Sequence, residues 1–126
     1  MKTKAVRLYG TKDLRLEEFE LPSMKEDEIL VKIMTDSVCM STYKLVQQGE
    51  NHKRAPKDLK HHPAVVGHEM SGVILKVGEK WKGKYKEGSK FMVQPDMNDH
   101  GVTKTAGYFY ENYGGDCTYC ILPKEV

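Results

Sequence analysis

Short runs in which apolar and polar residues alternate recur along most of this chain, a pattern typical of β-strands that bury one face. The first two runs are residues 4–8 and 14–19. The turn-forming sequence Gly-Thr-Lys-Asp lies between them at residues 10–13. The pattern therefore predicts a β-hairpin at the start of the chain.

A third run covers residues 28–35 and places Ile29, Val31 and Ile33 on one face. Since side chains alternate across a strand, this run predicts a strand that is at least half buried. Further short runs predict strands at residues 70–77, 89–93, 108–110 and 118–122. Strands spaced about ten residues apart, with turns between them, are typical of a β-barrel or a β-sandwich.

Only one segment has the features of a helix. Ser41 or Thr42 is a suitable N-cap for a short helix, and Gly49 is a suitable stop. Residues 50–62 then form a polar, basic segment, and a loop of this length in a compact domain is usually functional or mobile. No strand–GxGxxG–helix unit occurs, so we expect no dinucleotide-binding fold within these residues.

The composition of the chain excludes several classes of partner and location. The 126 residues suffice for one domain, and 20 basic against 18 acidic residues argue against nucleic acid as a partner. No stretch approaches the ~20 apolar residues of a membrane span, and the first residues lack the apolar segment of a secretion signal. Three cysteines do not suit a disulfide framework, so we predict a soluble, reduced, cytoplasmic protein.

Two short motifs carry the strongest candidate chemistry. Cys39 lies between a predicted strand and the predicted helix, and Gly67-His68-Glu69 leads into another strand. Thiolate, imidazole and carboxylate groups are three of the usual zinc ligands, and a three-ligand site leaves a fourth position for water or substrate. Judged by spacing alone, the favoured alternative is an inert buried cysteine and a surface His–Glu pair.

The order of these motifs resembles one known family. Residues 63–78 (Pro-Ala-Val-Val-Gly-His-Glu-Met-Ser-Gly-Val-Ile-Leu-Lys-Val-Gly) and residues 86–93 (Lys-Glu-Gly-Ser-Lys-Phe-Met-Val) strongly resemble the signature of zinc-dependent medium-chain dehydrogenases/reductases. The resemblance covers nearly the whole chain and includes the opening hairpin and the Cys39-x-Ser41 element. Shorter segments, among them residues 48–53, resemble the branch of the family that reduces ketose phosphates such as L-sorbose 1-phosphate.

The resemblance implies a GroES-like β-barrel, mainly β in class, with a short helix after Cys39 and long irregular loops. Residues 1–126 would be the N-terminal catalytic domain of a longer enzyme, and we expect the Rossmann cofactor domain and the returning C-terminal segment to be absent from them. A barrel without that segment would expose strand edges and apolar surface, so we expect a homo-oligomer. We expect this chain alone to be inactive as a reductase.

By position, the resemblance makes Cys39, His68 and Glu69 the ligands of a catalytic zinc ion, and Glu69 is counted among the catalytic residues as well. A further acidic or cysteine ligand of the family would lie downstream of Val126. Ser41 falls where the family has a hydroxyl that passes a proton to or from the substrate oxygen. The alternative is that Ser41 only caps the helix.

Three nearby positions bear on the substrate and on the tuning of the metal. Thr42 occupies the place of an aspartate that orients the zinc-bound histidine in relatives, so it departs from the family pattern. Lys44 stands where some relatives have a relay histidine and is a candidate phosphate contact, although a solvated lysine on the helix face is the favoured interpretation. Lys53 and Arg54 would also suit a sugar phosphate, although a solvated loop is the favoured interpretation.

The reaction that the resemblance implies is reduction of a ketose phosphate to a polyol phosphate, or the reverse oxidation, with zinc polarising the carbonyl. Hydride would come from NADH or NADPH on the absent Rossmann domain, so zinc and NAD or NADP are the expected cofactors. Two alternatives stay open. One is a polyol or alcohol dehydrogenase with a non-phosphorylated substrate, and the other is a non-enzymatic β-barrel binding module.

Cys117 and Cys120 form a CxxC motif, but three cysteines cannot make a four-cysteine zinc site in one chain. If they lie on a strand, a separation of three positions places them on opposite faces. Residues 94–113 replace the cysteine-rich lobe of many relatives and contain no cysteine, so we expect a single metal per chain.

Overall fold

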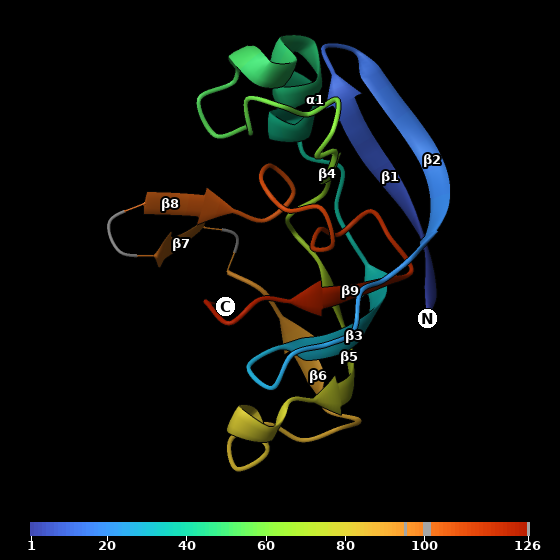
Figure 1. Cartoon of the computed structure of the whole chain (residues 1–126), viewed down its shortest axis with the longest axis vertical. Helices are drawn as coiled ribbons and strands as arrows, with labels where there is room; N and C mark the ends of the chain where they lie inside the picture. Colours follow the sequence, from blue (N-terminus) through green and yellow to red (C-terminus); the bar gives the residue numbers. More distant parts are fainter. Residues whose placement is uncertain (95, 100–101, 126) are drawn as a thin grey trace.

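The computed structural model describes residues 1–94, 96–99 and 102–125 and consists mainly of β-strands (Figure 1). The described strands are β1 (Lys2–Gly10), β2 (Asp13–Glu20), β3 (Ile29–Thr35), β4 (Ala64–Val65), β5 (Ser71–Val77), β6 (Lys90–Met92), β7 (Asp96–Asp99), β8 (Val102–Thr105) and β9 (Tyr119–Leu122). The helical elements are α1 (Met40–Gln48) and the 3-10 turns η1 (Gly49–Asn51) and η2 (Glu79–Trp81). None of the described helices has the length and apolar character needed to cross a lipid bilayer.

Two antiparallel sheets carry most of the strands. One has the order β2-β1-β4 and the other the order β6-β5-β3-β9, while β7 and β8 form a separate hairpin. The segment before β9 joins the sheets, because Ala5 pairs with Cys117 in an isolated bridge and Val6 N donates to Asp116 O at 2.9 Å. The Gly114–Cys117 region therefore lies beside β1 at the centre of the molecule.

Buried side chains form two core clusters. One brings together residues of the four-stranded sheet and its surroundings, namely Ile29, Val31, Met70, Ile74, Val77, Ala106, Tyr113, Cys120 and Leu122. The other joins β1, α1, the loop after η1 and β4, through Leu8, Leu45, Ala55, Leu59, Ala64, Val66 and Tyr108. Burial of these apolar side chains is the main favourable contribution to folding.

The tip of the β1–β2 hairpin holds the C-terminal end of α1 in place (Figure 1). Lys12 N donates to Val46 O at 2.7 Å, and Thr11 Oγ1 donates to Gln48 O at 3.3 Å. The last carbonyl groups of a helix have no partner within the helix, so these bonds satisfy two of them. They also fix the helix whose first residue follows Cys39.

The mainly β class predicted from the sequence is confirmed, and so are most of the predicted strands. The opening hairpin is β1–β2, and the runs at 28–35, 70–77, 89–93 and 118–122 are β3, β5, β6 and β9, each within one or two residues. Ile29 and Val31 are buried and Ile33 is half-buried, as the alternation predicted.

Residues 108–110 were predicted as a strand, and this is wrong. Gly107 has a φ of 77° and Tyr108 N donates to Thr105 O at 3.2 Å, so the chain turns here instead of continuing in an extended conformation. The predicted helix start is also wrong, by two or three residues. Cys39 is the N-cap, with extended φ and ψ, and no side chain caps the helix, so neither Ser41 nor Thr42 has that role.

Candidate metal centre

The structure brings Cys39, His68 and Glu69 together at one point. Cys39 lies at the N-cap of α1, and His68 and Glu69 lie in the segment between β4 and β5. One ligand atom from each residue, a sulfur, an imidazole nitrogen and a carboxylate oxygen, lies within 4.8 Å of the other two. His68 is buried, Cys39 is half-buried and Glu69 is exposed. These three side chains form a donor set that could hold a metal ion.

Ser41 lies inside this cluster. Its Oγ atom is 3.0 Å from Cys39 Sγ and 3.0 Å from His68 Nε2. The first turn of α1 places Ser41 there, because it is two residues after the N-cap that carries the cysteine. The hydroxyl group therefore faces the cluster and contacts two of its donor residues. It does not cap the helix.

His68 presents its two ring nitrogens to different surroundings. Nε2 faces Ser41, whereas Nδ1 is buried and has no hydrogen-bond partner among the residues that the structure describes. The ring of Tyr108 packs against His68 with a centroid distance of 5.5 Å. The family resemblance predicted that an aspartate which would orient this histidine is replaced by Thr42, and the unpartnered Nδ1 is consistent with that prediction.

Tyr108 also connects the cluster to the basic loop after α1. The ring of His52 lies 5.1 Å from that of Tyr108, on which His68 packs as well. Burial lowers the pKa of His52, and the positive charges of Arg54, Lys53 and Lys57 lower it further. Sequence reasoning missed both His52 and Tyr108, because no motif marks them and their role depends on contacts between distant segments.

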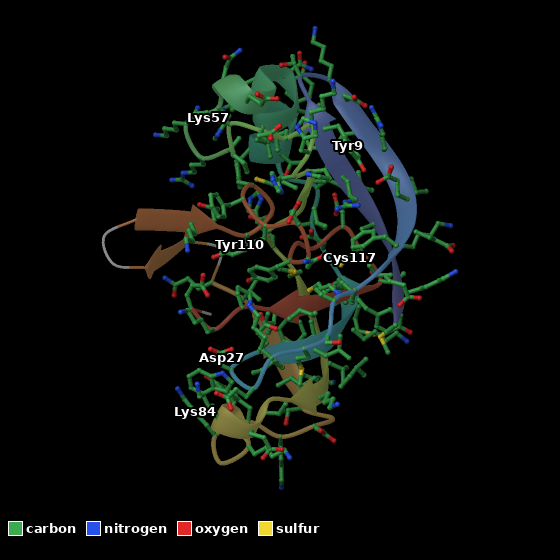
Figure 2. The ribbon with its side chains drawn as sticks, viewed as in Figure 1. Tyr9, Asp27, Lys57, Lys84, Tyr110 and Cys117 are labelled. Carbon is green, nitrogen blue, oxygen red and sulfur yellow. The ribbon has the colours of Figure 1, made fainter. Side chains whose placement is uncertain are left out.

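The candidate substrate contacts Lys44, Lys53 and Arg54 are not part of the packed rings of His52, Tyr108 and His68. Lys44 is exposed on α1, Lys53 is exposed in the loop, and Arg54 is half-buried. Lys57, from the same loop, lies at the outer edge of the molecule (Figure 2), where its Nζ donates to Glu50 O at 3.0 Å. The loop is anchored and not uniformly solvated, since Ala55 and Leu59 are buried in the core.

Asp36 and Asp116 form a pair of carboxyl groups behind the cluster. Asp36 Oδ1 accepts a hydrogen bond from the backbone N–H of Glu69 at 2.9 Å. Burial raises the pKa of Asp116 to about 6, with further contributions from the negative charge of Asp36 and a hydrogen bond to it. No sequence motif predicts this pair, because its two members lie 80 positions apart in the chain.

Cys117 and Cys120 do not lie on one strand, so the condition for placing them on opposite faces is not met. Cys117 precedes β9, so strand alternation does not apply to it, and both cysteines pack in the same core cluster. Figure 2 shows Cys117 in the interior of the molecule. Its hydrogen bond with Cys120 and its burial raise the pKa of the Cys117 thiol, which disfavours the reactive thiolate form.

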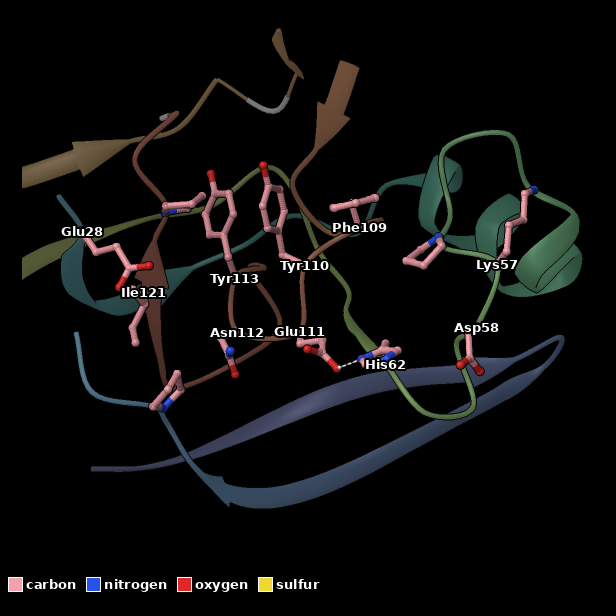
Figure 3. Close-up of a pocket in the computed structure, with 13 residues that line it drawn as sticks. Glu28, Lys57, Asp58, His62, Phe109, Tyr110, Glu111, Asn112, Tyr113 and Ile121 are labelled. Atoms are coloured by element: carbon pink, nitrogen blue, oxygen red, sulfur yellow. Dashed lines mark hydrogen bonds and ion pairs between the residues drawn. The ribbon is translucent and has the colours of Figure 1, made fainter. Parts of the chain in front are cut away.

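An open pocket of about 520 Å³ adjoins the cluster and is lined by Ser37, His68, Glu69, Met70, Ser71, Met92 and Val93. A separate groove of about 560 Å³ lies between the loop after α1 and β9 (Figure 3). Tyr110 and Tyr113 lie side by side in it, and His62 Nδ1 is 3.0 Å from Glu111 Oε1. Of these two hollows, the 520 Å³ pocket is the one that His68 and Glu69 line.

Comparison with known proteins gives consistent relatives. Residues 25–126 match the family described as alcohol dehydrogenase GroES-like domain. The chain is 43% identical over 124 residues to L-sorbose 1-phosphate reductase of Klebsiella pneumoniae, covering 98% of this chain and 30% of that protein. It is 47% identical over 122 residues to mannitol-1-phosphate 5-dehydrogenase of Aliivibrio fischeri, covering 97% of this chain and 29% of that protein.

A solved structure agrees with these sequence matches. The crystal structure of 2R,3R-butanediol dehydrogenase from Bacillus subtilis superposes with a TM-score of 0.79 at 26% identity, over 98% of this chain and 39% of that chain. The chain thus spans 30% or less of the length of the two enzymes that it matches in sequence.

Proposed function

Because the chain belongs to the alcohol dehydrogenase GroES-like domain family, we propose that it is the zinc-binding catalytic domain of an oxidoreductase. The observation that carries the proposal is the convergence of Cys39, His68 and Glu69, whose ligand atoms lie within 4.8 Å of one another. These residues come from two segments that are separated by about 30 positions, so sequence proximity alone does not bring Cys39 to the other two.

The donor set fits zinc in kind and in number. Thiolate sulfur, imidazole nitrogen and carboxylate oxygen are the ligand types that zinc accepts, and catalytic zinc sites commonly have three protein ligands and one open position. The pocket beside His68 and Glu69 supplies the open side. His68 would bind through Nε2, the nitrogen that faces Ser41.

When bound, the zinc ion would act as a Lewis acid on a substrate oxygen. The residues of this chain would orient that oxygen and move its proton. Ser41 Oγ lies 3.0 Å from both Cys39 Sγ and His68 Nε2, so a substrate oxygen at the cluster would lie within reach of its hydroxyl. Ser41 would therefore donate the proton to a ketone oxygen during reduction and accept it during oxidation.

For the substrate we propose a ketose phosphate and the corresponding polyol phosphate. Two relatives named for phosphorylated sugars or polyols support this proposal. The positive charges of Lys53, Arg54 and Lys57 all act on His52, whose ring packs on Tyr108 beside the cluster. Phosphate recognition needs cationic groups of this kind. The nicotinamide cofactor, NAD or NADP, would bind to a part of the enzyme outside residues 1–126.

The test uses the full-length enzyme with a ketose phosphate and the matching free ketose, in the presence of NADH or NADPH. We expect a higher kcat/KM for the phosphorylated ketose. Lys53→Ala and Arg54→Ala should raise the KM for the phosphorylated ketose and leave that for the free ketose unchanged. Lys82→Ala, which removes an exposed lysine at the distant turn η2, is the matched control and should change neither value.

Equal turnover of phosphorylated and free ketoses would contradict the substrate assignment and favour a dehydrogenase for non-phosphorylated polyols or alcohols. No turnover of either class, with zinc bound, would contradict the oxidoreductase proposal and favour a binding module.

A further inference from the structure

Asp36 lies directly after β3 and three positions before Cys39. Its Oδ1 atom accepts hydrogen bonds from two backbone N–H groups, that of Ser37 at 2.8 Å and that of Glu69 at 2.9 Å. One carboxylate oxygen therefore contacts both segments that supply the donors of the metal cluster. Hydrogen bonds to a carboxylate are stronger than those between neutral groups, so this contact is well suited to hold the segments together.

The contact is made where the β3–β5 ladder ends. The last pair of the ladder is Thr35 with Ser71, whose hydroxyl groups lie 2.9 Å apart. From that pair the chain runs toward Cys39 on one side, and toward Glu69 on the other. The bond from Glu69 N to Asp36 is the next connection between the two segments, and the Ser37 hydroxyl adds another by donating to Glu69 Oε2.

The other carboxylate oxygen of Asp36 is packed against backbone. Oδ2 is buried, and it lies so close to Gly67 and Gly115 that a Cβ atom on either residue would overlap with it. The two glycine residues are also bonded to each other, because Gly115 N donates to Gly67 O at 2.9 Å. Asp36 is thus enclosed between the Gly67 and Gly115 backbones, which restricts the positions that its carboxylate can adopt.

We propose that Asp36 is a positioning residue for the metal cluster. It holds the backbone of Glu69 against the segment that leads to Cys39, and so keeps the carboxylate of Glu69 and the thiol of Cys39 within coordinating distance of one ion. This inference rests on the proposed zinc site and adds a residue that touches neither the metal nor the substrate. Residues of this kind that orient ligands affect metal affinity strongly.

The test compares Asp36→Asn with Asp36→Ala by titrating the metal-free chain with Co²⁺ and following the absorption of the cobalt–thiolate bond. Asparagine keeps an oxygen acceptor for Glu69 N and places an amide beside Asp116, so Asp36→Asn should bind cobalt like the wild type. Alanine removes the acceptor, and Asp36→Ala should bind about 10- to 100-fold more weakly with a changed spectrum. Asp58→Ala, which removes an exposed carboxylate in the loop, is the matched control.

A second measurement keeps the inference testable if Asp36→Ala does not fold. Asp36→Ser has a side chain that is one bond too short to replace the carboxylate, and we expect it to weaken cobalt binding as alanine does. The amide proton of Glu69 should exchange with solvent faster in Asp36→Ser than in the wild type or in Asp36→Asn, with or without metal.

Several outcomes would overturn the inference. If Asp36→Ala or Asp36→Ser binds cobalt as tightly as the wild type, Asp36 does not position the cluster. If Asp36→Asn is as weak as these variants, the acceptor geometry is not the cause. A wild-type chain that binds no cobalt would overturn the proposed zinc site, and this inference with it.

Discussion

Ser41 contacts two of the three proposed ligands and has no role as a helix cap, so its hydroxyl is the best candidate for proton transfer. Ser41→Ala in the full-length enzyme should lower kcat by about 100-fold or more, because a positioned proton donor contributes that much to catalysis. Ser41→Thr keeps the hydroxyl and should retain most of the activity. Both variants should keep their zinc, and an unchanged kcat for Ser41→Ala would exclude the proposed role.

At the scale of single residues, the sequence predicted the side chains that a family motif marks. The motif predicts Cys39, His68, Glu69 and Ser41, and the structure brings these side chains together. Asp36 could not be predicted, because its importance comes from a bond to Glu69, a residue 33 positions away. A motif records which side chains do chemistry, but the contacts that hold them depend on how the segments pack.

At the scale of elements, the loop after α1 is anchored in the core by Ala55 and Leu59, and Leu59 is the larger of the two. Leu59 is completely buried in the cluster with Leu8 and Leu45, although its neighbour Lys60 is exposed. Leu59→Ala should lower the free energy of unfolding by about 2–5 kcal/mol, the usual cost of removing a buried leucine side chain. Urea denaturation measures this change.

The matched control for that prediction is Lys60→Ala, which should change the free energy of unfolding by no more than about 0.5 kcal/mol. A Leu59→Ala variant as stable as Lys60→Ala would mean that the loop is not anchored in the core. Lys53 and Arg54 belong to the same loop as Leu59.

Strands with regular alternation were predicted, and those without it were missed. β4 has two residues, both buried, so it is too short to show any period. The β7–β8 hairpin was missed because its sequence is rich in polar residues and lacks the alternation of a half-buried strand. Tyr108 is buried, as expected for a residue of an apolar run, but it lies in a turn after Gly107 and not in a strand. Tertiary packing, and not local pattern, decides such cases.

At the scale of the whole molecule, the carboxyl pair of Asp36 and Asp116 makes stability depend on pH. The pKa of Asp116 is raised from 3.8 to about 6 on folding, so the native state binds a proton more tightly than the unfolded state. Stability from this group is therefore highest below pH 4 and falls as the pH rises from about 4 to about 6. Above about pH 6 the ionised carboxylate lowers the free energy of unfolding by an amount that no longer changes with pH.

Asp116→Asn mimics the protonated carboxyl and should remove this pH dependence. At pH 7.5 the variant should be more stable than the wild type by on the order of 1 kcal/mol, a value that allows for the partial exposure of Asp116. At pH 4 the two chains should differ little. Urea denaturation of the metal-free chains at both pH values gives the comparison, and a difference that is the same at both would contradict the assignment.

The fold and the family were predicted from sequence and are confirmed, since the GroES-like domain matches over residues 25–126 and solved relatives superpose over nearly the whole chain. The expected homo-oligomer and the separate cofactor domain stay predictions. The ketose phosphate substrate stays a proposal, and its candidate contacts Lys53 and Arg54 lie in the loop after η1.

Zinc analysis of the purified chain tests the central claim most directly. The wild-type chain should hold zinc after extensive dialysis, whereas Cys39→Ser and His68→Ala should hold little or none. His61→Ala removes an exposed histidine outside the cluster and should keep its zinc, and zinc should raise the unfolding temperature of the wild type and of His61→Ala alone among these chains. Equal zinc contents in the wild type, Cys39→Ser and His68→Ala would contradict the proposed metal centre.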